Sequence, residues 1–194
     1  MLIFKVLLVT FVIIQNSIRF VFQRRYATTH AQKQTEKEPT REKWLVRYVG
    51  SSYAVAVLIW VLTDWLSFAQ MPFPDWLRYV GFLIGASSTY YFYLVHRQLG
   101  DNWSPVLEIR NKHQLVITGL YRFVRHPMYS SMLVGTVGIS LLVANWVVIF
   151  ITSLAFIVLC IVRIPDEEQL MTDTFGKQYQ DYMRKTKRLI PNLF

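Results

Sequence analysis

The sequence has little of what disulfide and metal sites are made from. Its 194 residues include one cysteine, Cys160, which lies within an apolar run. An intrachain disulfide and a cysteine-based metal site are therefore both excluded. The chain also lacks the G-x-G-x-x-G, P-loop and H-E-x-x-H motifs of dinucleotide, nucleotide and zinc sites. We expect no metal and no Rossmann-type cofactor site.

Acidic residues are also scarce, with 12 Asp and Glu against 21 Lys and Arg, which gives a net charge of +9. In a soluble protein such an excess would suggest a nucleic-acid partner. Here the basic residues gather in the segments between apolar runs, where the positive-inside rule of membrane proteins explains them. We therefore expect no nucleic acid as a partner.

Long apolar runs dominate a composition that is 53% hydrophobic. A bilayer core needs about 20 apolar residues per helix. Runs of that length cover residues 1–23, 44–68 and 76–99, and the run 128–162 is long enough for two short spans with a turn at Asn145-Trp146. The sequence predicts an all-α, polytopic membrane protein with five transmembrane helices, the last two a helical hairpin, and a cytosolic C-terminal helix.

We interpret residues 1–194 as a single membrane domain, with three spans in 1–99 and the polar candidates for catalysis in 100–194. Lys and Arg residues concentrate in the first and third loops and in the C-terminal segment, which predicts the N-terminus outside and the C-terminus in the cytosol. Gly81, Gly85 and Ser88 recur at near-helical spacing and predict close approach of another helix.

The unusual polar groups of the second half lie at the two ends of the predicted hairpin. A hairpin brings its ends together, so one set should meet the other: Arg125, His126 and Tyr129 against Arg163, Glu167 and Glu168. Ionisable groups at a membrane boundary are costly unless paired, and are often functional. The alternative is a purely structural ion cluster. Pro127 favours a helix start that places His126 where backbone N–H groups can receive an anion.

These residues resemble a known family. Arg125-His126-Pro127-Met128-Tyr129, followed after the hairpin by Glu167-Glu168, is similar to the RHPxY…EE signature of integral membrane methyltransferases, which include isoprenylcysteine carboxyl methyltransferases and phospholipid N-methyltransferases. The resemblance covers about residues 95–194 and extends to the lead-in 115–122 and the trailing elements Phe175-Gly176, Tyr179, Tyr182 and Leu189-Ile190-Pro191. Ser130-Ser131 stands where many members carry a glycine. The chain resembles a minimal, prokaryotic member of the first group.

The resemblance implies S-adenosylmethionine as cofactor and S-adenosylhomocysteine as product. One wall of the cofactor pocket would be formed by His113, Gln114, Leu115, Val116 and Tyr121. The other would be formed by His126, Pro127, Met128 and Tyr129, with Glu167 and Glu168 binding polar atoms of the cofactor. Arg163 would face the substrate as the catalytic, orienting residue.

Three functions remain open on the sequence. A carboxylate acceptor is ionised at neutral pH, needs no general base and suits Arg163. This favours methyl esterification of a prenylated cysteine or a similar lipid-like acid. An amine acceptor, as in a phospholipid N-methyltransferase, arrives mostly protonated and would be repelled by Arg163. The third possibility is a non-catalytic membrane scaffold. As partners we expect the lipid-like substrate and membrane lipids, and we expect a monomer with its active site facing the cytosol.

Overall fold

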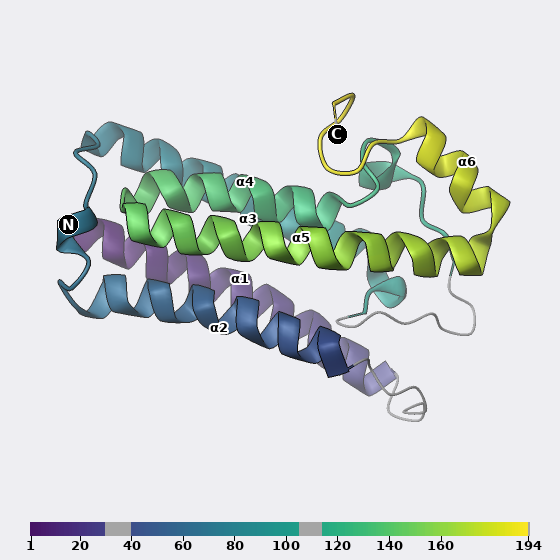
Figure 1. Cartoon of the computed structure of the whole chain (residues 1–194), viewed down its shortest axis with the longest axis horizontal. Coiled ribbons are helices and arrows are strands. Elements are labelled where there is room, and N and C mark those ends of the chain that lie inside the picture. Colours follow the sequence, from purple (N-terminus) through teal and green to yellow (C-terminus); the bar gives the residue numbers. More distant parts are fainter. Residues whose placement is uncertain (30–39, 105–113, 194) are drawn as a thin grey trace.

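The structure, a computed structural model, describes residues 1–29, 40–104 and 114–193 (Figure 1). Within these ranges the chain is helical and contains no β-strand. The helices are α1 Leu2–Thr29, α2 Thr40–Leu62, α3 Asp75–Leu99, α4 Pro127–Val143, α5 Trp146–Phe175 and α6 Lys177–Lys185, with short 3-10 turns at η1 Ser67–Ala69, η2 Gly100–Asn102 and η3 Gly119–Arg122. The prediction of an all-α protein is confirmed.

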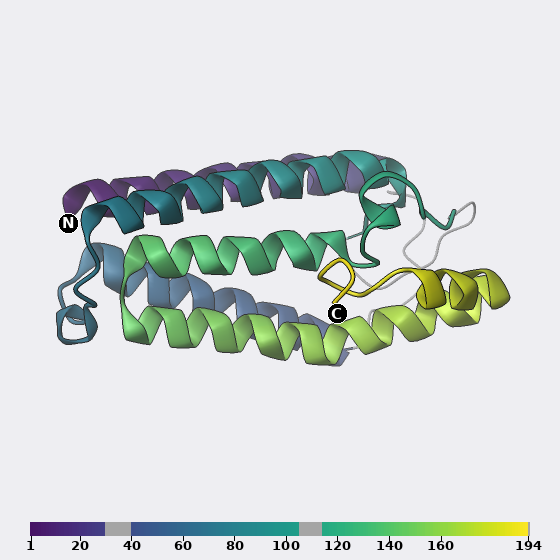
Figure 2. The same ribbon diagram turned by 90° about the horizontal axis from the view of Figure 1, so that it is seen from above.

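The five long helices lie side by side as one bundle, and α6 lies at the end of the bundle opposite the N-terminus (Figure 1). Figure 2 shows α4 between a layer formed by α1 and α3 and a layer formed by α2 and α5. A core of aromatic and aliphatic side chains, including Phe4, Leu8, Trp60, Leu142 and Val148, joins these layers near the N-terminal end of the bundle.

Three helices are long and apolar enough to cross a membrane, over Leu2–Thr28, Trp44–Leu62 and Trp146–Phe175. The prediction of an integral membrane protein with several spanning helices is confirmed. Helix α4 is apolar but has only 17 residues. Helix α3 has the length but carries Asp75, Arg78, His96 and Arg97, which lower its hydropathy. The count of five spans therefore remains a prediction.

The contact between α3 and α4 is made by small residues that allow the two backbones to touch. Gly81 and Gly85 on α3 face Gly138 on α4. Ser88 on α3 donates a buried hydrogen bond of 2.7 Å to the Ser131 carbonyl on α4. Close backbone contact replaces the burial of large side chains, as is common between membrane helices. The prediction that Gly81, Gly85 and Ser88 admit another helix is confirmed.

We expect Gly138→Ala to destabilise the protein. A Cβ atom at Gly138 would lie 2.6 Å from the Gly85 nitrogen and 2.9 Å from the Gly81 oxygen. These are backbone atoms that cannot rotate away, so α3 and α4 must separate at a cost of about 1–3 kcal/mol. Chemical unfolding in mixed micelles measures the change. The matched control is Gly50→Ala in α2, where nothing lies within 4 Å of the added Cβ. Equal stability of the two variants would refute the argument.

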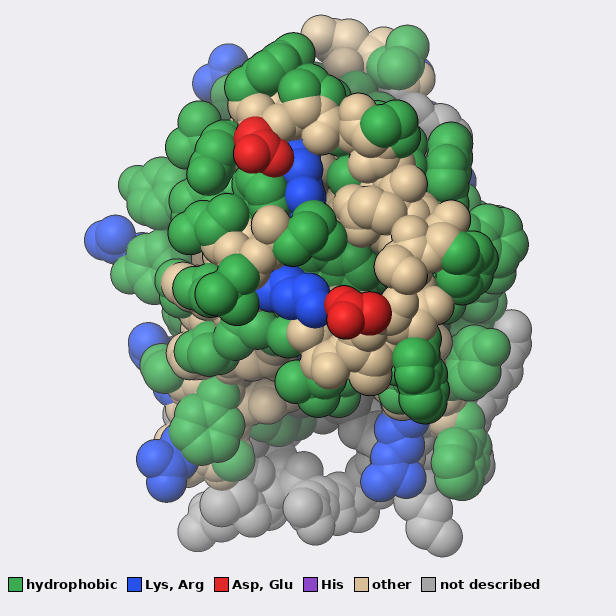
Figure 3. Space-filling view, turned by 90° about the vertical axis from the view of Figure 1, so that its left-hand side faces the viewer, with side chains coloured by type: hydrophobic (Ala, Val, Ile, Leu, Met, Phe, Trp, Pro, Cys, Tyr) green, Lys and Arg blue, Asp and Glu red, His purple; other side chains and the backbone are tan. Residues whose placement is uncertain are grey.

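The connection between α4 and α5 consists of two residues that reverse the chain. Ala144 adopts a left-handed conformation with φ 50°, and the Asn145 side chain caps α5 by accepting from the backbone N–H groups of Val147 and Val148. Asn145 also donates to the Leu66 carbonyl at 2.7 Å, which ties the turn to the segment after α2. At the same end of the bundle the surface is mostly apolar with a few charged side chains (Figure 3). Lys5 and Asp64 form an ion pair at 3.7 Å on this surface.

Helix α5 is longer than the apolar run predicted, because it continues past Pro165 to Phe175. The i, i+4, i+8, i+11 spacing of Met171, Phe175, Tyr179 and Tyr182 predicts one apolar face of a single helix, and this prediction is wrong because the four residues are divided between α5 and α6. Gly176 adopts φ 53° and ends α5, and α6 then begins in a new direction. A positive φ of this kind favours glycine and cannot continue an α-helix.

Candidate active site

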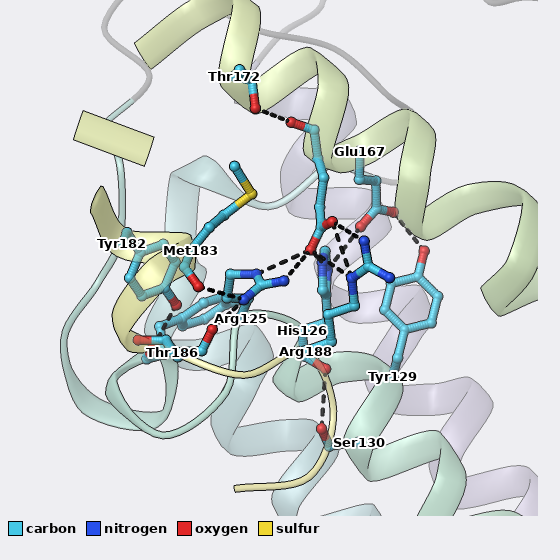
Figure 4. A network of polar contacts seen from close by, with 12 residues as sticks. Arg125, His126, Tyr129, Ser130, Glu167, Thr172, Tyr182, Met183, Thr186 and Arg188 are labelled. Atoms are coloured by element: carbon cyan, nitrogen blue, oxygen red, sulfur yellow. Dashed lines mark hydrogen bonds and ion pairs between the residues drawn. The ribbon is translucent and has the colours of Figure 1, made fainter. Parts of the chain in front are cut away.

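Three segments that are distant in sequence meet at the C-terminal end of the bundle: the start of α4, the second half of α5 and the segment that follows α6 (Figure 4). Pro127 is the first residue of α4, where its missing N–H costs no hydrogen bond, and His126 is the N-cap. The side chain of Glu167 projects from α5 toward this helix start (Figure 4), and the next residue, Glu168, contacts Arg125 and His126 there.

Glu168 lies at the centre of an ion network. Its carboxylate is buried, with 9% of the side chain exposed, and it accepts from Arg125 at 2.8 and 3.0 Å. Arg188 donates to both carboxylate oxygens, at 2.7 Å from Nη2 and 3.1 Å from Nε. This hydrogen bond raises the pKa of Arg188. Buried charge is tolerated here because every partner is paired.

His126 bridges the two glutamates. Its Nε2 lies 3.2 Å from Oε1 of Glu168, and its Nδ1 lies 3.4 Å from Oε2 of Glu167. Burial lowers the pKa of His126, but the hydrogen bonds that its ring donates to Glu167 and Glu168 outweigh burial, so the pKa is raised. Ionised carboxylates only accept hydrogen bonds, so both ring nitrogens carry a proton when both glutamates are ionised. The ring is then an imidazolium between two carboxylates.

Glu167 connects this network to the membrane-facing part of α5. Its Oε1 accepts from the Tyr129 hydroxyl at 2.5 Å and from Arg163 Nε at 3.0 Å. Its Oε2 faces His126. Arg163 lies one helical turn before Glu167, so Glu167 fixes one edge of the guanidinium. The expected meeting of the two hairpin ends is therefore confirmed for Arg125, His126 and Tyr129 against Glu167 and Glu168, and Arg163 joins them through Glu167 on its own helix.

The segment after α6 is attached to the start of α4 by backbone hydrogen bonds. The N–H groups of Arg125 and His126 donate to the carbonyls of Lys187 and Arg188 at 2.7 and 3.0 Å. The Ser130 hydroxyl donates to the Leu189 carbonyl at 2.6 Å. Arg125 reaches the same segment with its side chain, donating to the carbonyls of Met183 and Thr186. The segment after α6 is thus held against the Arg125-His126 end of the RHPxY…EE region as a third element of the site.

The other predicted cofactor residues lie on the segment before α4. Gln114 is exposed, Leu115 and Val116 are half-buried, and the Gln114 N–H points to Asn102 Oδ1 at 3.4 Å. Tyr121 lies in η3, where its carbonyl accepts from the Tyr182 hydroxyl at 2.5 Å. Met128 is half-buried in the first turn of α4. None of these contacts the glutamates through a hydrogen bond in the described part of the chain, and His113 lies outside it.

Comparisons with known proteins agree with this geometry. Residues 79–173 match the model of the isoprenylcysteine carboxyl methyltransferase family. The chain is 28% identical over 132 residues to a probable protein-S-isoprenylcysteine O-methyltransferase of Oryza sativa subsp. indica, covering 67% of this chain and 69% of the relative. A Schizosaccharomyces pombe protein-S-isoprenylcysteine O-methyltransferase is 29% identical over 160 residues, covering 73% and 68%. Residues 79–173 therefore belong to the isoprenylcysteine carboxyl methyltransferase family.

A solved member of the isoprenylcysteine carboxyl methyltransferase family has the same fold. The structure of the eukaryotic intramembrane Ras methyltransferase of this family superposes with a TM-score of 0.56 at 18% sequence identity. The superposition covers 92% of this chain and 65% of the other, so the present chain spans less than two thirds of that protein. The family and the enzyme class predicted from the sequence are confirmed.

Three side chains near the site were not predicted from the sequence, and one of them, Arg188, lies beyond residue 173, where the family match ends. Arg188 is one of the basic residues of the C-terminal segment, and its position directly before the Leu189-Ile190-Pro191 element was the signal that could have placed it at the site. Ser130 was noted only as a small residue. A third, Arg19 in α1, lies close enough to Arg163 for their charges to repel. Its signal was a basic residue inside an apolar run.

Proposed function

We propose that this protein is an S-adenosylmethionine-dependent methyltransferase that esterifies the carboxylate of a prenylated cysteine or a similar lipid-like acid. The observation that carries the proposal is the array His126–Glu167–Arg163, placed at the end of a membrane bundle in a chain of the isoprenylcysteine carboxyl methyltransferase family. The array presents a carboxylate beside a guanidinium, so it can receive a cationic group and an anionic group side by side.

The residues present fit the cofactor. A carboxylate has about four acceptor positions. Glu167 uses three of them for Tyr129, Arg163 and His126, which leaves one on Oε2 for an ammonium group among the described contacts. The half-buried apolar side chains of Leu115 and Val116 suit the adenine and ribose portion. When bound, S-adenosylmethionine would supply an activated methyl group.

The task of the protein is then alignment. Holding two reacting groups in line can supply several kcal/mol of barrier reduction. Arg163 would orient the acceptor carboxylate, and Glu167 fixes the guanidinium from behind at 3.0 Å. A carboxylate is already ionised at neutral pH, so no base has to remove a proton.

The phospholipid N-methyltransferase alternative is less well supported. An amine acceptor would have to lose a proton before it could attack. The glutamates that could take it are engaged by cations, since Glu168 accepts from Arg125, His126 and Arg188 and Glu167 accepts from Arg163. Arg163 would also repel the ammonium form.

For the membrane arrangement we propose five crossings, with the short α4 crossing between the layer of α1 and α3 and the layer of α2 and α5. The N-terminus would be outside, and the site and C-terminus in the cytosol, following the distribution of Lys and Arg. A prenyl or acyl chain gains about 0.8 kcal/mol per buried CH₂ in the bilayer. The substrate would therefore approach laterally from the lipid while the cofactor arrives from the cytosol. We propose that a monomer suffices.

The acceptor class is tested by incubating the purified protein with radiolabelled S-adenosylmethionine and a farnesylated N-acetylcysteine. The expected product is a methyl ester that releases labelled methanol in base. The same assay with phosphatidylethanolamine tests the alternative, because a methylamine is stable to alkali. Labelled lipid amine, and no ester, would replace the proposed function by N-methylation.

We expect Glu167→Gln to fold and to bind S-adenosylmethionine more weakly. Losing one charge-assisted hydrogen bond costs about 1.5–3 kcal/mol, or about a 10- to 150-fold weaker affinity. Calorimetry in detergent measures it. Asp166→Asn is the matched control, because Asp166 is the exposed neighbour on the same helix. Equal affinities of the two variants would limit Glu167 to structural pairing, and no binding by the unmodified protein at millimolar cofactor would support a scaffold.

A further inference from the structure

A depression, separate from the glutamate network, lies where the C-terminal end of α3 meets η3. It is an open cleft of about 510 Å³. Its described lining is made by Leu94, Arg97, Gln98, Gly119, Leu120, Arg122 and Phe123. None of these side chains bonds to Glu167 or Glu168. The cleft is therefore a feature that the proposed reaction does not use.

The wall formed by η3 is held in place by Gln98 of α3. Its amide oxygen accepts from the Leu120 N–H at 2.9 Å, and its amide nitrogen donates to the Thr118 carbonyl. Gly119 adopts φ 58°, and a Cβ there would collide with the Gln98 side chain. The two walls are thus fixed to each other, and the cleft is a built feature of the fold.

The charge of the cleft is positive. Arg97 and Arg122 are both exposed, and neither forms an ion pair with any residue that the structure describes. No Asp or Glu is among the described lining residues. Arg122 lies over the ring of Phe123, 5.7 Å from its centroid, which holds the guanidinium above an aromatic surface. Two unpaired guanidiniums suit an anion such as a phosphate.

The cleft continues into an apolar, outward-facing stripe on α3. Leu83, Tyr90, Leu94 and Arg97 are spaced at i, i+7, i+11 and i+14, which places them on one helix face. Leu83 and Tyr90 are 65% and 64% exposed, and Phe123 at the mouth of the cleft is 58% exposed. In a membrane protein such side chains face acyl chains. The stripe therefore runs from the hydrocarbon region to the two arginines at the membrane boundary.

We propose that this cleft binds the headgroup phosphate of an anionic phospholipid, with one acyl chain along Leu83, Tyr90 and Leu94. Guanidiniums above an apolar helix face match a molecule that is anionic at one end and apolar along its length. A soluble phosphate ester would use the arginines but leave the apolar stripe uncovered. Because η3 carries Tyr121 of the predicted cofactor pocket, a bound lipid would also hold that segment against α3.

The test places the protein in nanodiscs of phosphatidylcholine in which about one lipid in ten is phosphatidylglycerol, an anionic lipid. Native mass spectrometry of the protein released from the nanodiscs then measures how much phosphatidylglycerol it retains. We expect retained phosphatidylglycerol in the unmodified protein and a large loss in R97Q/R122Q. A basic residue near anionic lipid contributes about 1 kcal/mol, so two predict about a 25- to 30-fold weaker retention. The matched control is R24Q/R47Q, which removes two exposed arginines that also lie over aromatic rings.

Four outcomes decide between lipid binding in the cleft and its alternatives. Loss in R97Q/R122Q alone supports the cleft. Equal retention in the two variants and the unmodified protein overturns it, and equal loss in both variants overturns it in favour of general surface charge. Glycerol 3-phosphate that competes at micromolar concentration would show a soluble anion site in place of a lipid site. Thermal unfolding of both variants verifies that the fold is retained.

Discussion

Arg163→Lys is expected to fold, to bind S-adenosylmethionine near normally and to lose most of its turnover, by about 10- to 1000-fold, or about 1.4–4 kcal/mol. Arg163 donates from Nε to Glu167 at 3.0 Å and is 14% exposed. Its planar group can hold Glu167 along one edge while another edge orients an acceptor carboxylate. A lysine has one nitrogen and cannot reproduce a planar two-point grip. Single-turnover methyl transfer to the farnesylcysteine analogue measures the loss.

The control for this variant is Arg184→Lys, because Arg184 is 76% exposed and pairs only with Asp181 in the described contacts, on α6. It should retain full turnover. If Arg163→Lys also retained turnover, Arg163 would be a membrane anchor, a role that any long cation fills. The main argument for a carboxylate over an amine acceptor would then be lost. Cofactor calorimetry on the same sample separates this result from misfolding.

Glu168→Gln is expected to lower the free energy of unfolding by about 3–5 kcal/mol, the range measured when one partner of a buried ion pair is removed. The neutral amide would leave three cationic side chains, Arg125, His126 and Arg188, without the carboxylate that they share. Arg125 and His126 are buried against Glu168, whereas Arg188 is 41% exposed. Chemical unfolding in mixed micelles measures the stability.

The loss should be concentrated in the segment after α6. We expect the amides of Arg125 and His126, which donate to Lys187 and Arg188, to exchange hydrogen much faster in Glu168→Gln. Asp173→Asn on the same helix is the control, because Asp173 is exposed and accepts from the neutral Gln169 side chain. Stability changes within about 0.5 kcal/mol of each other in the two variants would contradict a central role for Glu168.

Much of the site could be predicted because hairpin geometry is local. Two antiparallel helices joined by Ala144 and Asn145 must return the chain to its starting depth, so the residues before α4 meet those late in α5. The charged side chains then form ion pairs with one another, because an unpaired ion at a membrane boundary is costly. The lengths of the apolar runs predicted the long helices because a run of about 20 apolar residues matches the thickness of a bilayer core.

What the sequence did not reveal depends on distant or backbone-level detail. The end of α5 is set by a positive φ at Gly176, which a residue pattern cannot distinguish from an ordinary helical glycine. Arg188 reaches Glu168 only because a reversal after α6 brings the chain back to α4. The contact of Gly138 with Gly85 fixes the helix register and needs both helices in place.

The attachment of residues 187–189 to the start of α4 also sets an order of assembly. Glu168 is synthesised before Arg188, which follows it by 20 residues. Before Arg188 is synthesised, Arg125 and His126 are the partners of the carboxylate among the described residues. The backbone N–H groups of Arg125 and His126 have not yet met the carbonyls of Lys187 and Arg188 that accept from them. The helices of the bundle can thus insert and pack first, and the ion network around Glu168 is completed last.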